Sequence, residues 1–190
     1  MDKPLIIEQT FRDVDFRNTG LDLAEYEGCH FKNCSFSNLD LSGMAFPESE
    51  FNQCDLSNVK TNRTIFRDTR FVGSKLLGIH FENCDDFLFT VRFETCVLNF
   101  SSFYMRQLKK TGFVNCSLAD VDFTGADLSY ALFQDCDLSG ARFENTILEH
   151  ADLRTTVNYN IDPELNRIKK AKFSMSGLYG LLEKYDIYIS

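Results

Sequence analysis

Apolar residues recur at every fifth position through most of this chain of 190 residues. The period is plain in Ala126-Asp127-Leu128-Ser129-Tyr130 and in Cys136-Asp137-Leu138-Ser139-Gly140, where leucine is the central residue. A five-residue period fits neither an α-helix, which repeats at about 3.6 residues, nor a single strand, which repeats at about two. Repetition over this length instead predicts a solenoid, whose coils stack and bury one continuous core.

The central residues fall into two series. The first runs at five-residue intervals from Phe11 to Phe81, and the second runs from Leu88 to Leu153. The step between the series is longer than five residues, so residues are inserted within 82–87. We therefore predict a lead-in or cap over residues 1–10, a solenoid over 11–153, and a separate C-terminal module over 154–190.

A second inward position is predicted two residues before each centre, where small side chains occur. All of the cysteines occupy it, namely Cys29, Cys34, Cys54, Cys84, Cys96, Cys116 and Cys136. Free cysteine behaves as a small buried hydrophobe. The last three recur every 20 residues, which predicts coils of four repeats with like residues stacked in ladders. The expected ladders include Leu88, Leu108, Leu128 and Leu148, and also Phe93, Phe113 and Phe133.

Two stretches break the repeat. The stretch Glu82–Arg92 contains the insertion and is expected to place Asp86 at an inward position. The stretch Tyr104-Met105-Arg106-Gln107 places Arg106 at another inward position and exposes Tyr104 and Met105. Such departures occur at functional sites and at bulges that absorb strain, and both interpretations stay open.

After Leu153 the period ends and helical signals follow. Asp162-Pro163 is typical of a helix N-terminus, and Leu165 and Ile168 are expected to face inward and close the last coil. A second helix is predicted over 177–184, followed by a strand-like segment over 185–189. The tail is more apolar than a cap requires, so it is also a candidate partner surface.

The repeat Ala-(Asp/Asn)-Leu-X-X resembles that of the pentapeptide-repeat proteins, and the resemblance spans the whole chain. It implies an all-β fold, the right-handed quadrilateral β-helix of that family, with a short C-terminal helical cap and dimerisation tail. Residues 11–153 would then form about seven coils. With about 4.8 Å between stacked strands, the rod would be roughly 30–35 Å long.

The residue types with catalytic potential do not converge on a site. His30, His80 and His150 fall at outward positions without a cysteine or serine partner, and no metal or phosphate-binding motif occurs. The sequence has no N-terminal apolar h-region and no long apolar run, so we expect no signal peptide or membrane span. An odd number of inward thiols is typical of a reducing compartment. We expect a cytoplasmic protein that is not an enzyme and has no disulfide, metal or cofactor.

Charge adds a second theme, because the 28 acidic residues outnumber the 20 basic ones and the excess is densest in the late repeats. The set comprises Asp120, Asp122, Asp127, Asp135, Asp137, Glu144 and Asp152. Arg142 is the base that opposes them in the sequence. Such a surface repels nucleic acid, which binds through cationic contacts, and attracts proteins that hold DNA. The alternative is an acidic surface that only solubilises the protein.

The tail segments Asn158–Asp162, Asn166–Ser174 and Leu181–Ile187 resemble the C-terminal module of the gyrase-protecting pentapeptide proteins, the subgroup of Qnr, AlbG, McbG and MfpA. The resemblance implies a homodimer formed through the tails. It also implies that the acidic set forms a DNA-like face that engages DNA gyrase or a related type II topoisomerase. The expected dimer contact comprises Leu178, Leu181, Leu182, Tyr185, Ile187 and Ile189.

The resemblance implies that binding protects the topoisomerase from a fluoroquinolone or a peptide toxin, or modulates it. Qnr proteins project loops from their coils, whereas this sequence has one short insertion. The irregular stretch, namely Asp86, Tyr104, Met105 and Arg106, is a rival contact site. The alternative function is a structural or adaptor module for another protein partner.

Overall fold

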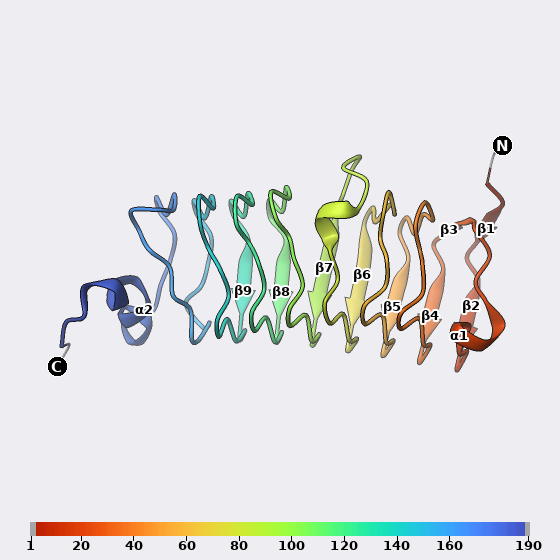
Figure 1. Ribbon diagram of the computed structural model, residues 1–190, viewed down its shortest axis with the longest axis horizontal. Helices are drawn as coiled ribbons and strands as arrows, with labels where there is room; N and C mark the ends of the chain where they lie inside the picture. Colours follow the sequence, from red (N-terminus) through yellow and green to blue (C-terminus); the bar gives the residue numbers. More distant parts are fainter. Residues whose placement is uncertain (1–2, 189–190) are drawn as a thin grey trace.

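The computed structural model describes residues 3–188 and shows a parallel β-solenoid with the two termini at opposite ends (Figure 1). Seven strands, one from each of seven successive turns, form a parallel sheet in the order β2-β4-β5-β6-β7-β8-β9, and β1 pairs with β3. Their bounds are β1 Leu5–Ile7, β2 Thr10–Arg12, β3 Glu25–Glu27, β4 His30–Lys32, β5 Glu50–Asn52, β6 Thr69–Val72, β7 Val91–Glu94, β8 Gly112–Val114 and β9 Leu132–Gln134.

Helical structure is short and lies mainly at the ends of the rod. The α-helices are α1 Phe16–Thr19 and α2 Tyr179–Leu182, and the 3-10 helices are Phe81–Asn83, Met175–Gly177 and Glu183–Tyr185. Among the described residues no helix is both long enough and apolar enough to cross a membrane. The predicted solenoid with a short C-terminal helix is thus confirmed.

Most repeats bend because the residue two positions after the centre adopts the left-handed conformation. Asn33, Asn38, Gly43 and Glu48 follow the centres Phe31, Phe36, Leu41 and Phe46 in this way, with φ between 53° and 74°. Such φ values are uncommon outside glycine, asparagine and aspartate. Four such bends make up this coil, and the neighbouring strand lies 20 residues on, as the register Phe31↔Phe51 shows.

The predicted phenylalanine ladder is present, and the predicted leucine ladder is present except for Leu88. Phe93, Phe113 and Phe133 stack with ring centroids 5.2 and 4.9 Å apart. A second ladder, Phe81, Phe103, Phe123 and Phe143, meets the first edge to face; the Phe113–Phe123 pair is 6.0 Å apart at 83°. Stacked and edge-to-face pairs are the favoured aromatic arrangements, so these two ladders form a continuous aromatic column inside the solenoid.

The second inward position has a hydrogen-bonding role that the sequence did not reveal. All seven cysteines are buried, and Cys54 Sγ donates to the carbonyl of Phe31 in the preceding coil at 3.3 Å. Thr69 Oγ1 does the same to Phe46 at 2.7 Å. Small donors at this position therefore satisfy an inward carbonyl, as buried polar groups require. Burial raises the pKa of Cys54 to about 12, which keeps the thiol protonated.

The solenoid extends beyond the predicted bounds of 11–153. Ile6 pairs with Tyr26 in the first coil, and parallel bridges continue through Ile147↔Arg167 and Asp152↔Lys172. The expected helix after Asp162-Pro163 is absent, because this segment forms a turn and re-enters the coil. Leu165, predicted to face inward, is exposed.

The end of the tail also differs in part from the prediction. The predicted second helix corresponds to α2 and its flanking 3-10 turns. No strand forms over 185–188, because Glu183–Tyr185 is a 3-10 helix that ends at Asp186 in the left-handed conformation. Ile189, named in the expected dimer contact, lies outside the described residues.

Candidate functional site

The predicted acidic set surrounds the rod instead of forming one face. Asp122 stacks between Ser102 and Arg142, and Asp127 stacks between Gln107 and Ile147. Asp137 and Asp152 belong to two further columns. Because a bend separates each column from the next, these four carboxylates lie on four sides of the solenoid. The expectation of a single acidic face is therefore wrong in its geometry.

Four of these aspartates have a structural task. Each accepts a hydrogen bond from the backbone N–H two residues later, at 2.9 to 3.3 Å; they are Asp122, Asp127, Asp137 and Asp152. An aspartate that bonds its own backbone two residues on stabilises a turn. The carboxylate immediately before the centre thus closes the bend of its own repeat, which explains why the repeat favours Asp or Asn there.

Bases from neighbouring segments also neutralise part of the set. Lys109 Nζ lies 3.2 Å from Asp127, and Arg154 and Lys172 lie 2.8 and 3.6 Å from Asp152. The side-chain hydrogen bond from Arg154 lowers the pKa of Asp152. The sequence indicated only Arg142 as an opposing base, because the others come from adjacent coils or from the following bend.

Three members of the set remain free of both roles. Asp120, Asp135 and Glu144 are exposed and form no ion pair with any residue in the range 3–188. They lie on three different bends, because each follows a different inward column by one or two residues. These three carboxylates, hereafter the free carboxylates, are the members of the acidic set that a partner could contact without opening a bend.

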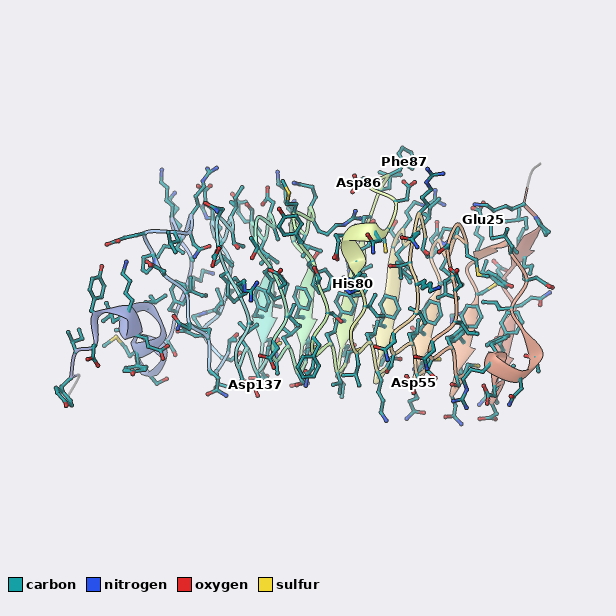
Figure 2. All side chains as sticks on the ribbon, in the orientation of Figure 1. Glu25, Asp55, His80, Asp86, Phe87 and Asp137 are labelled. Atoms are coloured by element: carbon teal, nitrogen blue, oxygen red, sulfur yellow. The ribbon has the colours of Figure 1, made fainter. Side chains whose placement is uncertain are left out.

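The insertion within the stretch Glu82–Arg92 forms a loop that projects from the rod beside β7 (Figure 1). Asp86, predicted to face inward, is instead exposed, with Phe87 next to it at the tip of the loop (Figure 2). Leu88, predicted to join the leucine ladder, is 55% exposed because its left-handed φ of 54° turns it outward. Phe89 packs against the core instead and contacts Phe81 edge to face.

Arg106 holds this loop, and its predicted inward placement is confirmed with a side chain that is 4% exposed. Its guanidinium donates to the carbonyls of Cys84 and Asp85 at 3.2 and 3.1 Å and to the carboxylate of Asp86. It also lies 4.1 Å above the ring of Phe89. One buried arginine therefore binds three consecutive residues of the insertion, a contact set typical of guanidinium.

The bend beside Arg106 is apolar and accessible. Tyr104 and Met105 are exposed as predicted, and Phe87 and Leu88 add further apolar surface on the loop that Arg106 holds. Together these four residues are the rim patch. Exposed apolar residues that gather in this way are typical of interaction sites.

Part of the predicted dimer contact packs against the solenoid, and the rest stays exposed. Leu178, Leu181 and Leu182 are only partly exposed, and Leu181 packs against the core. The tail packs on the last coil because Gly180 lies against Tyr159, where an added Cβ would clash with the Tyr159 carbonyl oxygen. Lys184 bonds Asp162 and Glu164 at 2.7 Å.

The outer surface of the tail keeps an apolar patch. Tyr185 and Ile187, from the predicted contact, are about half exposed, and Met175, Tyr179 and Tyr188 are more exposed still. These last three were not selected from the sequence, because a helical register cannot be assigned across a segment that mixes 3-10 and α turns.

Two of the histidines contact surface side chains. His80 Nδ1 lies 2.8 Å from Glu82 on the surface, and His150 stacks on Tyr130 at 4.5 Å. Within the described part of the chain, no group of three or more His, Cys, Asp or Glu side chains could hold a metal ion.

Solved structures with this fold cover nearly the whole chain. A trypsin-treated form of QnrB1, a plasmid-mediated fluoroquinolone resistance protein, superposes with a TM-score of 0.50 at 19% identity, over 98% of this chain and 100% of its own. HetL from the cyanobacterium Nostoc sp. strain PCC 7120, a pentapeptide repeat protein involved in heterocyst differentiation regulation, gives a TM-score of 0.59 at 16% identity. It covers 93% of this chain and 89% of its own. At these identities the likeness shows the fold.

The sequence itself matches family models. A model of the pentapeptide repeat region matches residues 86–173, and a model of eight pentapeptide repeats matches residues 49–85. No curated protein matches the chain. With the five-residue bends and the stacked coils described above, these matches establish that the chain belongs to the pentapeptide-repeat family.

Proposed function

We propose that this chain is a cytoplasmic, non-enzymatic binding protein that engages DNA gyrase or a related type II topoisomerase. In this proposal it protects the enzyme from a fluoroquinolone or a peptide toxin, or modulates its activity. The observation that carries the proposal is the placement of the free carboxylates, because they present unneutralised charge on three bends of a stiff rod. The end-to-end likeness in fold to QnrB1, a fluoroquinolone resistance protein, supports the same direction.

The free carboxylates also define how binding should behave. Fixed negative charge on a rod attracts a protein surface built to hold DNA. Exposed charge pairs are individually worth about 0–1 kcal/mol, so no single carboxylate should dominate. Raising salt should weaken binding, since the Debye length falls from about 10 Å at 0.1 M to about 3 Å at 1 M.

A supercoiling assay with purified DNA gyrase, with and without a fluoroquinolone, tests the proposal. Without the drug, the wild-type protein should change the supercoiling activity of gyrase if it modulates the enzyme. With the drug, it should preserve that activity if it protects the enzyme. The triple variant Asp120→Lys, Asp135→Lys, Glu144→Lys should abolish the effect, because it reverses the charge and leaves intact the aspartates that accept a hydrogen bond from the backbone N–H two residues later. The matched control is Asp13→Lys, Glu48→Lys, Asp68→Lys, which makes the same charge change on exposed bends of earlier coils and should retain the effect.

A different outcome would favour the rim patch. If the triple variant keeps its effect on gyrase and Tyr104→Ala loses it, the contact lies at the irregular stretch and should depend little on salt. If the wild-type protein has no effect on gyrase at all, the second candidate function applies, a structural or adaptor module for another protein. The exposure of Phe87, Leu88, Tyr104 and Met105 is the observation that favours this alternative.

We also propose that two copies associate through the tail. Tyr179, Tyr185 and Ile187 form exposed apolar surface beyond the last coil, and a two-fold contact would remove it from water. Light scattering should give a dimer for the wild-type protein and a monomer for Ile187→Glu, whose side chain is half exposed and can be changed without opening the coil. A wild-type protein that is monomeric at micromolar concentration would refute this proposal.

A further inference from the structure

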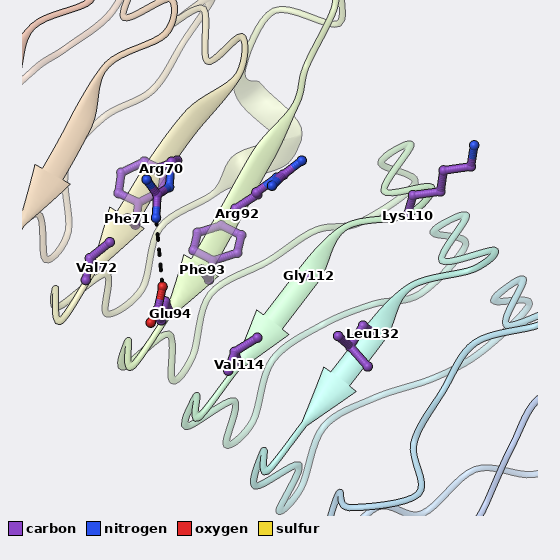
Figure 3. Close-up of a pocket in the computed structure, with 10 residues that line it drawn as sticks. All are labelled: Arg70, Phe71, Val72, Arg92, Phe93, Glu94, Lys110, Gly112, Val114 and Leu132. Carbon is purple, nitrogen blue, oxygen red and sulfur yellow. Dashed lines mark ion pairs between the residues drawn. The ribbon is translucent and has the colours of Figure 1, made fainter.

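The large sheet carries a basic groove that belongs to none of the surfaces above. Its basic residues are Arg70 on β6, Arg92 on β7 and Lys110 just before β8 (Figure 3). Gly112 forms its floor, where an added Cβ would meet nothing within 4 Å, and Val114 and Leu132 lie on its apolar side. The groove has a volume of about 330 Å³. This is the lower end of the range typical of small-ligand sites.

The groove exists because side-chain size changes abruptly along one column of registered residues in the sheet. The registered residues are Arg70, Arg92, Gly112 and Leu132 on four successive strands. The missing side chain at Gly112 leaves a gap between Arg92 and Leu132. A second hollow of about 320 Å³ adjoins it, shares its three basic residues and adds Lys109.

The charges in this groove are incompletely balanced. Arg70 lies 3.3 Å from Glu50 and 3.9 Å from Glu94. Arg92 and Lys110 form no ion pair with any residue that the structure describes. The sheet register places Arg92 directly beside Arg70, and like charges opposite one another destabilise a sheet. An anion between them would remove this repulsion.

We propose that this groove binds a small organic phosphate, with its phosphate between Arg92, Arg70 and Lys110 and its apolar body over Gly112. Arginine binds phosphate through two parallel N–H donors, and such charge-assisted bonds are the strong ones. The body of the ligand would lie against Val114 and Leu132. Glu94, at the edge of the groove, disfavours a ligand with a second anionic group there. This site is independent of the topoisomerase proposal, since it uses none of the free carboxylates.

Titration calorimetry with the full chain tests the site, using phenyl phosphate as the probe and inorganic phosphate and benzyl alcohol as partial probes. Phenyl phosphate should bind one to one and more tightly than either partial probe. Arg92→Gln should weaken phenyl phosphate at least about ten-fold through the loss of a charge-assisted bond. Gly112→Leu should weaken it comparably by filling the groove, without any change in charge.

Arg142→Gln is the matched control, because it removes the same charge from another side of the rod, beside Asp122. It should leave the affinity for phenyl phosphate unchanged. Equal affinity in wild type, Arg92→Gln and Gly112→Leu would overturn the proposal, as would an equal loss in Arg142→Gln. Benzyl alcohol binding that is as tight as phenyl phosphate would also overturn it, because the groove would then recognise no anion. Circular dichroism of each variant verifies that the solenoid is folded.

Discussion

The coils from Val91 to Leu153 and the segment from Glu82 to Thr90, which contains the insertion, lie side by side and are held together in different ways. In the coils, each repeat has the same inward centre, the same left-handed bend and the same bonds to the next coil. In the insertion, a 3-10 helix and a loop interrupt this pattern, and Arg106 binds three of its residues. Repetition spreads stability over many equivalent contacts, whereas the insertion depends on one side chain from the next coil.

The largest effect should come from the regular interior. Phe123→Ala should lower the free energy of unfolding by about 3–5 kcal/mol, as expected for loss of a buried phenylalanine. The ring is fully buried and stacks on Phe103 and Phe143 at 5.4 and 5.2 Å. Urea denaturation followed by circular dichroism measures the change. Phe100→Ala is the control, because that ring is 64% exposed on a bend, and similar losses for both variants would contradict the ladder argument.

The next effect should come from the arginine that holds the insertion. Arg106→Met keeps much of the side-chain volume but leaves the carbonyls of Cys84 and Asp85 without their donor. Unsatisfied buried groups cost about 1–3 kcal/mol each, so we expect about 2–3 kcal/mol of destabilisation. Hydrogen exchange should rise over residues 85–90 while the exchange of β8 and β9 stays slow.

Asp86→Asn tests the ion pair of Arg106 separately from its hydrogen bonds to the carbonyls of Cys84 and Asp85. The Asp86 side chain is 96% exposed, so losing its charge should cost only about 0–1 kcal/mol. If Asp86→Asn destabilises as much as Arg106→Met, the ion pair holds the loop and the carbonyl bonds do not.

The same comparison explains how far the sequence could be interpreted. Phe113 and Cys116 could be placed inward from their spacing alone, because every coil repeats the same environment. Leu88 could not, because the length of an insertion does not say which of its residues returns to the core. Phe89 occupies the interior position instead and packs beneath Arg106. This contact joins two coils, so no local period in the sequence predicts it.

The candidate site was harder to predict for a related reason. The spacing marked Asp137 as outward, but only the structure shows that it bonds the N–H of Ser139 and closes a bend. Likewise Asp162-Pro163 has local helix signals, yet Arg167 pairs with Ile147 and draws the segment back into the solenoid. Net charge can be counted from a sequence, but which carboxylates remain free depends on the register of neighbouring coils.

Another small effect concerns a bend of the regular coils and depends on pH. Burial pushes the pKa of Asp127 upward, but hydrogen bonds from Ser129 and Lys109 outweigh burial and hold that pKa below its usual 3.8. A carboxyl whose pKa is depressed on folding stabilises the folded state above its unfolded pKa, and this contribution is lost as pH falls through the folded value. The stabilisation from Asp127 should therefore be complete at neutral pH and decline below about pH 4.

Asp127→Asn should cost about 1 kcal/mol at pH 7 through weaker hydrogen bonding, and it should reduce the steepness of acid destabilisation. The stability of Ser129→Ala should lie between those of Asp127→Asn and the wild type. Ser129 Oγ donates to Asp127 at 2.6 Å and is lost in this variant, whereas the hydrogen bond from the Ser129 backbone N–H at 3.0 Å remains. Urea midpoints measured from pH 7 to pH 3 give both quantities. If the difference in urea midpoint between Asp127→Asn and wild type stays constant from pH 7 to pH 3, the carboxylate does not stabilise the bend through its charge. The regular coils would then differ from the insertion only in the geometry of their bends.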